Sequence, residues 1–256
     1  MSRLTLAFVG QCHTVGYEGV PADAAFPEVC RGVIQASRPE VDVQLLVEPY
    51  YHPVELAKAT RTVLAQAARV VIVEVVGWLA VSGSEVVDLS RLPRGVRSAY
   101  QRAQHLRRVA RAVAKKTPQE AGLIHTVRTS ALSAASTLLR PLLPRAPRPT
   151  VAQYEHHVAD ALATIRAHGA TPVVQGPGAP NLALDSRRMP SDALDRYRSV
   201  HQMARRVAEG QSALYVDRWD TVAGGFFIPG TVRPTAGGHS VWGHLLGREL
   251  LNAGIV

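Results

Sequence analysis

Five short apolar runs, each followed by a segment with helical spacing, constrain the fold of this chain most strongly. The most apolar run covers residues 70–76, and the others cover residues 4–9, 41–47, 172–175 and 213–216. Runs of this kind predict strands that are buried on both faces. The intervening patterns predict helices at residues 23–36, 54–68, 96–115, 151–168, 191–209 and 236–252. This alternation predicts an α/β protein with a five-stranded parallel sheet between two layers of helices.

The length of 256 residues suits one α/β domain, which we expect to span residues 1–256. Residues 117–149 are less regular, and four prolines gather near the end of this segment. We therefore expect a variable insertion there at about 117–149, which is either a helix or lid over the site or a long connection.

The chain has two cysteines, Cys12 and Cys30, so a disulfide framework is not expected and a reducing compartment fits best. The apolar run at the start is too short for a signal peptide, and no run is long enough to cross a membrane. The sequence predicts a soluble cytoplasmic protein without a membrane partner.

The net charge is +9, and the basic excess gathers between Arg91 and Arg148, where Glu120 is the one acidic residue. Such a segment could attract an acidic partner. Aromatic interleaving, zinc-ligand spacing and a helix-turn-helix pattern are all missing, so we expect no nucleic-acid partner. A solvated, arginine-rich helix face accounts for the charge better.

The first strand ends at Gly10 and delivers Gln11, Cys12 and His13 to its carboxyl end. In open α/β sheets ligands bind at that end of the strands. Any chemistry should therefore centre on the Cys12 thiol with the His13 imidazole beside it. Position alone leaves a packing role and a functional role for Cys12 equally open.

Glu74 stands inside the apolar run at residues 70–76. Burial of an unpaired carboxylate costs several kcal/mol, on the order of 3–5 kcal/mol when a partner is lost. We therefore expect Glu74 to be paired, hydrogen-bonded or placed at the end of its strand.

Several blocks of the sequence, taken in order, resemble the SGNH (GDSL-like) hydrolases. Residues 230–239, GTVRPTAGGH, resemble the closing Asp-x-x-His-Pro-(Thr/Asn)-x-x-Gly-His block. Residues 10–14, GQCHT, resemble the opening Gly-Asp-Ser block, and residues 70–78, VVIVEVVGW, resemble the third block. The resemblance covers essentially the whole chain. It implies a flavodoxin-like, three-layer α/β/α fold with strand order 2-1-3-4-5.

The chain departs from the signature residues of that family. Cys12 takes the place of the nucleophilic Ser, with Gln11 before it in place of Asp. Trp78 takes the place of the oxyanion-holding Asn, and Arg233 the place of the catalytic His. The second-block Gly has no counterpart, and a residue near Tyr51 could supply its backbone N–H.

These replacements still allow covalent chemistry. Arg233 cannot act as a base, but its guanidinium could lower the pKa of a nearby thiol or hold a carboxylate or phosphate. A Cys12 thiolate could take an acyl group from an ester or thioester. His239 and His13 are the candidate bases, although the family commonly has a second, structural His at the position of His239. Trp78 favours a flat or hydrophobic ligand over ordinary ester hydrolysis.

Two functions follow. The chain is either a divergent SGNH-like acyltransferase, thioesterase or cyclase working through Cys12, or an inactive member that binds a ligand or partner. The expected substrate is a small acyl compound, free or held on a carrier protein, and no cofactor or metal is expected. Candidate substrate-binding residues are Gln11, Trp78, Arg233, Tyr51 and Asn181, the last of which lies in the loop after the fourth strand. The oligomeric state is left open.

Overall fold

A computed structural model describes most of the predicted sheet and its helices. The described residues are 2–16, 20–50, 52–77, 85–87, 145–147, 149–179, 192–221, 226 and 234–256. At Cys12, 85–87 and 145–147 the description covers the backbone alone. The chain divides into two compact units, one made of Met1–Ser82 with Pro149–Val256 and the other of Gly83–Arg148.

The larger unit contains a parallel sheet with the predicted strand order. Its strands are β1 (Ser2–Gly10), β2 (Val41–Pro49), β3 (Val70–Glu74), β6 (Thr171–Gln175) and β7 (Leu214–Val216). They are arranged β2-β1-β3-β6-β7, and every neighbouring pair is parallel. The expected order 2-1-3-4-5 is therefore confirmed.

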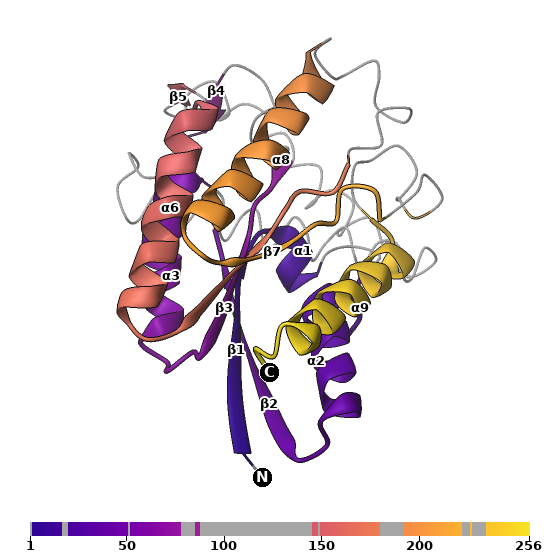
Figure 1. The fold of residues 1–256 in the computed structure, drawn as a ribbon. Coiled ribbons are helices and arrows are strands. Elements are labelled where there is room, and N and C mark those ends of the chain that lie inside the picture. The colour runs from indigo at the N-terminus through magenta and orange to yellow at the C-terminus, as the bar shows by residue number, and fades with distance from the viewer. Residues whose placement is uncertain are drawn as a thin grey trace, which may run out of the picture. The chain divides into compact units, whose positions relative to one another are not determined.

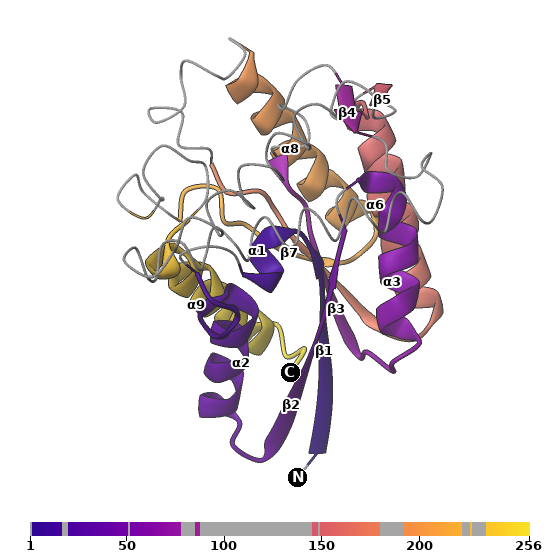
Figure 2. The ribbon, with the colours of Figure 1, turned by 180° about the vertical axis from the view of Figure 1, so that it is seen from behind.

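Helices cover both faces of this sheet (Figures 1 and 2). One face carries α2 (Phe26–Ser37) and α9 (Ala236–Asn252). The other carries α3 (Leu56–Leu64), α6 (Val151–Ala167) and α8 (Ala193–Gly210). The three-layer α/β/α architecture implied by the resemblance is thus present.

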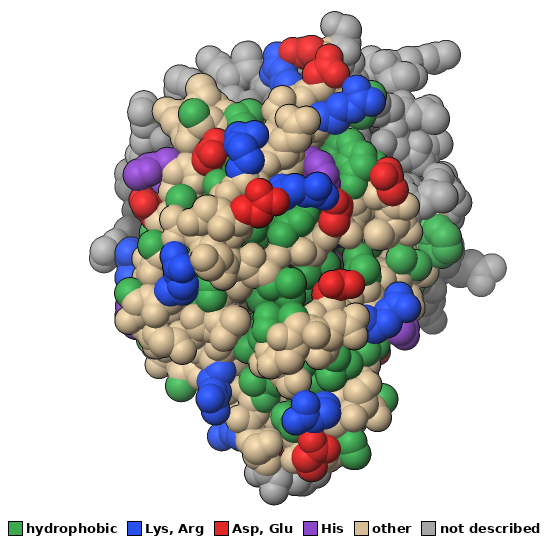
Figure 3. Space-filling view, viewed as in Figure 1, with side chains coloured by type: hydrophobic (Ala, Val, Ile, Leu, Met, Phe, Trp, Pro, Cys, Tyr) green, Lys and Arg blue, Asp and Glu red, His purple; other side chains and the backbone are tan. Residues whose placement is uncertain are grey.

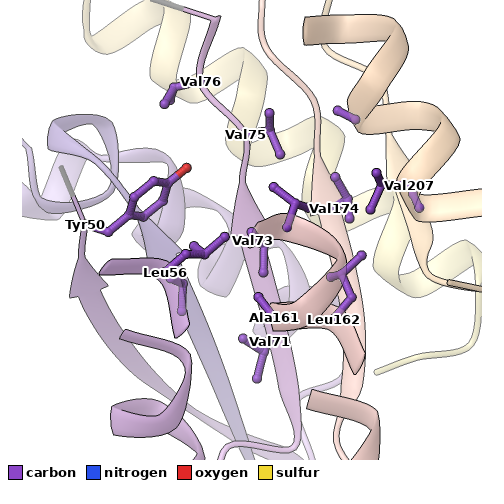
Figure 4. Close-up of a cluster of buried hydrophobic side chains, with 14 of the residues drawn as sticks. Tyr50, Leu56, Val71, Val73, Val75, Val76, Ala161, Leu162, Val174 and Val207 are labelled. Atoms are coloured by element: carbon purple, nitrogen blue, oxygen red, sulfur yellow. The ribbon is translucent and has the colours of Figure 1, made fainter. Parts of the chain in front are cut away.

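Two hydrophobic cores lie between these layers, because successive strand residues point to opposite faces. On β1, Leu6 and Phe8 pack toward α2 and α9, whereas Ala7 and Val9 pack toward the opposite helices. Figure 4 shows the second core, where valines of β3 and β6 meet side chains of α3, α6 and α8. Burial of each Val or Leu side chain contributes roughly 1.5–3 kcal/mol, which makes these cores the main source of stability.

Two predicted helices have different bounds, for local reasons. The segment predicted at 23–36 forms a 3-10 turn at Ala22–Ala24, and α2 begins only at Phe26 with Pro27 in its first turn. Proline is accommodated there because backbone N–H groups in the first turn of a helix have no acceptor within the helix, so the N–H that proline lacks is not missed. The segment predicted at 54–68 begins with a 3-10 turn at Pro53–Glu55, and α3 ends before Ala67, whose φ is 58°.

The predicted helix at 96–115 lies outside the described residues. So does the predicted insertion at 117–149, apart from 145–147 and Pro149. In the smaller unit, β4 (Glu85–Val87) pairs antiparallel with β5 (Arg145–Pro147).

Charged side chains of both signs lie interspersed on the face drawn in Figure 3. Ion pairs on α8 join Arg206 to Glu155 of α6 and Arg196 to Asp192. The described surface of α8 is therefore electrostatically mixed. Within the described part of the chain, no helix is both long and apolar enough to span a bilayer.

Candidate active site

The turn that carries Cys12 follows directly from the carboxyl end of β1. The short helix α1 (Cys12–Val15) begins after Gln11, whose backbone is extended. Thr14 closes the turn, because its N–H and its hydroxyl both donate to the Gln11 carbonyl, at 2.9 and 2.6 Å. The backbone therefore places Cys12 at the carboxyl end of β1, where the sequence predicts the site.

Glu74, the last residue of β3, lies beneath this turn and is almost fully buried. Its Oε2 accepts the backbone N–H of Gln11 at 3.1 Å, and its Oε1 lies 3.2 Å from His13 Nδ1. Arg218 Nη2 donates to the same Oε1 at 2.7 Å. The expectation that Glu74 is paired and stands at the end of its strand is confirmed.

The Glu74 carboxylate is charged despite its burial. Burial alone would raise the pKa of this carboxyl, but the charges of Arg218 and His13 act in the opposite direction. Hydrogen bonds from the His13 ring and the Gln11 N–H add to that effect, and together they hold the pKa of Glu74 well below its usual range.

Arg218 reaches Glu74 from the far side of β6. It stands two residues beyond Val216, the end of β7, and β6 lies between β7 and β3. Its Nε donates to the Gly176 carbonyl at 2.6 Å, and its guanidinium lies 4.2 Å from the centre of the Trp242 ring. These contacts hold a buried cation in one orientation.

His239 has the environment of a structural histidine. It is fully buried, and its Nδ1 accepts the Phe26 N–H at 3.1 Å, so the neutral ring carries its proton on Nε2. Burial, reinforced by the nearby His13, lowers the pKa of His239 to about 3. This geometry favours the structural role over the role of a base.

His13 has the environment of a base. Its Nδ1 faces the Glu74 carboxylate, which acts as the acceptor, so the remaining ring nitrogen, Nε2, is the basic one in the neutral ring. The Trp242 and His239 rings pack against it edge-on, at centroid distances of 5.7 and 6.1 Å. A histidine oriented by a buried carboxylate is one of the arrangements that can act as a general base.

Two buried tyrosines join the strand ends around the site. The Tyr50 hydroxyl donates to the Glu74 carbonyl at 2.6 Å, and the Tyr154 hydroxyl lies 2.6 Å from the Tyr50 hydroxyl. The Val76 N–H donates to Tyr154 at 3.1 Å, and the Tyr50 N–H donates to the Gly10 carbonyl at 2.8 Å. Burial raises the pKa of both tyrosines, so both stay neutral.

The other candidates named from the sequence are not all described. Trp78, Tyr51, Arg233 and Asn181 lie outside the described residues, as does the side chain of Cys12. Gln11, His13 and His239 are described, and all three are buried.

Sequence reasoning did not assign Glu74, Arg218 or Tyr154 to the site, whereas it did expect residues 48–52, which include Tyr50, to line it. Of the unassigned residues, only Glu74 carried a signal, as a carboxylate within an apolar run. Among the described residues, no group of three or more His, Cys, Asp or Glu side chains could hold a metal ion.

Comparison with known proteins identifies the fold. No protein-family profile and no curated protein matches the sequence. Among solved structures, a lipase/acylhydrolase from Enterococcus faecalis is 14% identical with a TM-score of 0.60, and the match covers 98% of this chain and 96% of that one. A catalytic mutant of Axe2, an acetylxylan esterase from Geobacillus stearothermophilus, is also 14% identical, with a TM-score of 0.58 over 98% and 95% of the two chains. A protein assigned to the G-D-S-L lipolytic family from Desulfitobacterium hafniense is 12% identical, with a TM-score of 0.54 over 96% and 99%. The chain therefore has the SGNH-hydrolase fold.

Proposed function

We propose that this protein is an acyl-transfer enzyme of the SGNH fold that uses the Cys12 thiolate as nucleophile and His13 as proton acceptor. The observation that supports it is the pairing of His13 Nδ1 with the buried Glu74 carboxylate, immediately beside Cys12. A thiol needs less activation than a serine hydroxyl, so an oriented histidine is sufficient.

The reaction would proceed in two steps. His13 Nε2 accepts the proton of the Cys12 thiol, and the sulfur attacks the acyl carbonyl carbon of an ester or thioester. Collapse of the tetrahedral intermediate releases the alcohol or thiol, which takes the proton from His13, and leaves an acyl group on Cys12. Water, an alcohol, an amine or an internal nucleophile then attacks the acyl carbon and gives its proton to His13. The carbon–sulfur bond breaks and the sulfur takes that proton back, which regenerates the Cys12 thiol and completes hydrolysis, transfer or cyclisation.

Substrate binding is assigned to the remaining candidates from the sequence. Arg233 would hold a carboxylate or phosphate, Trp78 would contact a flat or apolar group, and Tyr51 would supply a backbone N–H. Gln11 and Asn181 would complete the site. The substrate would be a small acyl compound, free or held on a carrier protein that docks on the basic segment at residues 91–148. A reactive thiol favours the reducing cytoplasm.

The test is intact-protein mass spectrometry after exposure to a panel of activated acyl esters and acyl thioesters. We expect an acyl adduct on the native protein that maps to Cys12 and is lost in Cys12→Ala. Cys30 serves as the matched control, because it is fully buried in α2 and burial raises the pKa of its thiol to about 12. Cys30→Ala should therefore acylate like the wild type.

The opposite result has a clear meaning. If no acyl donor modifies Cys12 while the folded protein still binds an acyl compound, the acyl-transfer proposal is wrong and the protein is a ligand-binding member of the fold.

A further inference from the structure

One buried carboxylate contacts both neighbours of Cys12 along the chain. Glu74 Oε2 accepts the backbone N–H of Gln11, and Glu74 Oε1 faces the ring of His13. The two contacts, at 3.1 and 3.2 Å, hold the residues before and after Cys12 against β3. Glu74 is thus in a position to control both the backbone of the turn and the proton acceptor.

The carboxylate is itself held in place. Arg218 Nη2 donates to Oε1, and the guanidinium is fixed by the Gly176 carbonyl and the Trp242 ring. The Glu74 backbone carbonyl accepts the Tyr50 hydroxyl. Gly10 leaves the space that the carboxylate occupies, since a Cβ there would lie 2.7 Å from Glu74 Oε2. Both ends of the residue are therefore immobilised.

We propose that Glu74 is the positioning residue of the Cys12 site, which fixes the turn through Gln11 and stabilises the Cys12 thiolate–His13 imidazolium pair. The proposal rests on the proposed function for the role of that pair. When the thiol proton moves to His13, the ring becomes a cation whose Nδ1–H donates to a carboxylate, so the charge-separated state gains a charge-assisted hydrogen bond.

The groups facing His13 decide the sign of this effect. Among the residues that the structure describes, they include Glu74 on β3, Arg218 beyond β7, and His239 and Trp242 on α9. Arg218 opposes a cation on His13, but its Nη2 donates to Glu74 Oε1, the same oxygen that His13 Nδ1 faces directly at 3.2 Å. His239 is neutral because burial lowers its pKa to about 3. The direct contact with Glu74 therefore dominates.

The experiment measures the rate of alkylation by iodoacetamide between pH 5 and 9. Because Cys30 is buried, the native protein reports Cys12. In Glu74→Gln we expect alkylation at pH 6 to be about tenfold slower and the midpoint of the profile to move to higher pH. Glu28→Gln, which removes a surface carboxylate paired with Arg31, should leave the profile unchanged.

A second variant guards against failure to fold. Glu74→Gln leaves the Arg218 guanidinium buried without its counter-charge, so Glu74→Gln with Arg218→Met is measured alongside. Replacement of both members of a buried ion pair is tolerated better than loss of one. The double variant should show the same slower alkylation at pH 6.

His13→Gln separates positioning from a purely structural role. In that background the Cys12 thiolate–His13 imidazolium pair cannot form, so Glu74→Gln should have no further effect on the alkylation rate. An equal slowing in both backgrounds, or a wild-type profile for the folded Glu74→Gln protein, would overturn the proposal. If the coupling is observed but no acyl adduct forms, the positioning role stands and acyl transfer is refuted.

Discussion

At the scale of single residues, the nucleophile turn depends most directly on Gly10. An added Cβ would lie 2.2 Å from Thr14 Cγ2 and 2.7 Å from Glu74 Oε2. Neither neighbour can yield, because Thr14 closes the turn and Glu74 is immobilised. We expect Gly10→Ala to lower the free energy of unfolding by about 2–3 kcal/mol, as measured by urea denaturation.

Gly32→Ala is the matched control for this substitution. Gly32 lies within α2, and an added Cβ would meet nothing within 4 Å. Alanine is the better helix former, so this variant should be more stable than the wild type by about 0.5–1 kcal/mol. If the Gly10→Ala protein is as stable as the wild type, the turn can accommodate a Cβ at residue 10 and the steric argument is wrong.

Single residues also show how far the site could be predicted. That Glu74 is paired could be predicted from the cost of burying an unpaired carboxylate, without knowing which residue is its partner. The partner, Arg218, is 144 positions away in the sequence. It follows β7 and reaches Glu74 across β6, which lies between β3 and β7 in the sheet. No local pattern encodes such a contact. The roles of Trp78, Arg233, Tyr51 and Asn181 stay predictions.

At the scale of elements, α9 lies close against α2 because glycines face that helix. An added Cβ at Gly243 would lie 2.5 Å from Val29 Cβ and 2.8 Å from the Phe26 carbonyl oxygen. The same packing recurs one turn later, where a Cβ at Gly247 would lie 2.8 Å from Val33 Cβ. Gly243→Ala should force the helices apart and lower the unfolding free energy by about 1–3 kcal/mol.

The measurement is again urea denaturation, with Gly210→Ala as control. Gly210 ends α8, and a Cβ there would meet nothing within 4 Å. This control should match or exceed wild-type stability. Equal stability of Gly243→Ala and the wild type would contradict the close approach of α2 and α9.

Elements were predicted better than their bounds. Apolar runs identified all five strands of the sheet, because parallel strands are buried on both faces. Their order came from the family resemblance, since periodicity carries no information about neighbours. Helix starts were misplaced at Phe26 and Leu56, where 3-10 turns at Ala22–Ala24 and Pro53–Glu55 precede each helix. Such turns share the local pattern of a helix and differ only in hydrogen bonding.

At the scale of the whole molecule, buried titratable groups make stability depend on pH. Burial lowers the pKa of His239, His201 and His157 in the folded state. Each such histidine binds a proton in the unfolded chain before it does so in the folded protein. Its contribution to stability is therefore present above the unfolded pKa and is lost as pH falls. Glu74, whose pKa is lowered, adds a further loss at lower pH, below the ordinary carboxyl range.

His239 should account for much of the first loss, because its pKa of about 3 leaves a wide window below about pH 6.5 in which only the unfolded chain is protonated. Within that window its contribution changes by about 1.4 kcal/mol per pH unit. His239→Asn removes the titration while its side-chain oxygen can accept the Phe26 N–H in place of Nδ1. We expect this variant to be less stable than the wild type at pH 7 but to lose less stability between pH 6 and pH 4.5. Urea denaturation at several pH values measures both slopes, and parallel curves for the two proteins would mean that His239 titrates alike in the folded and unfolded states.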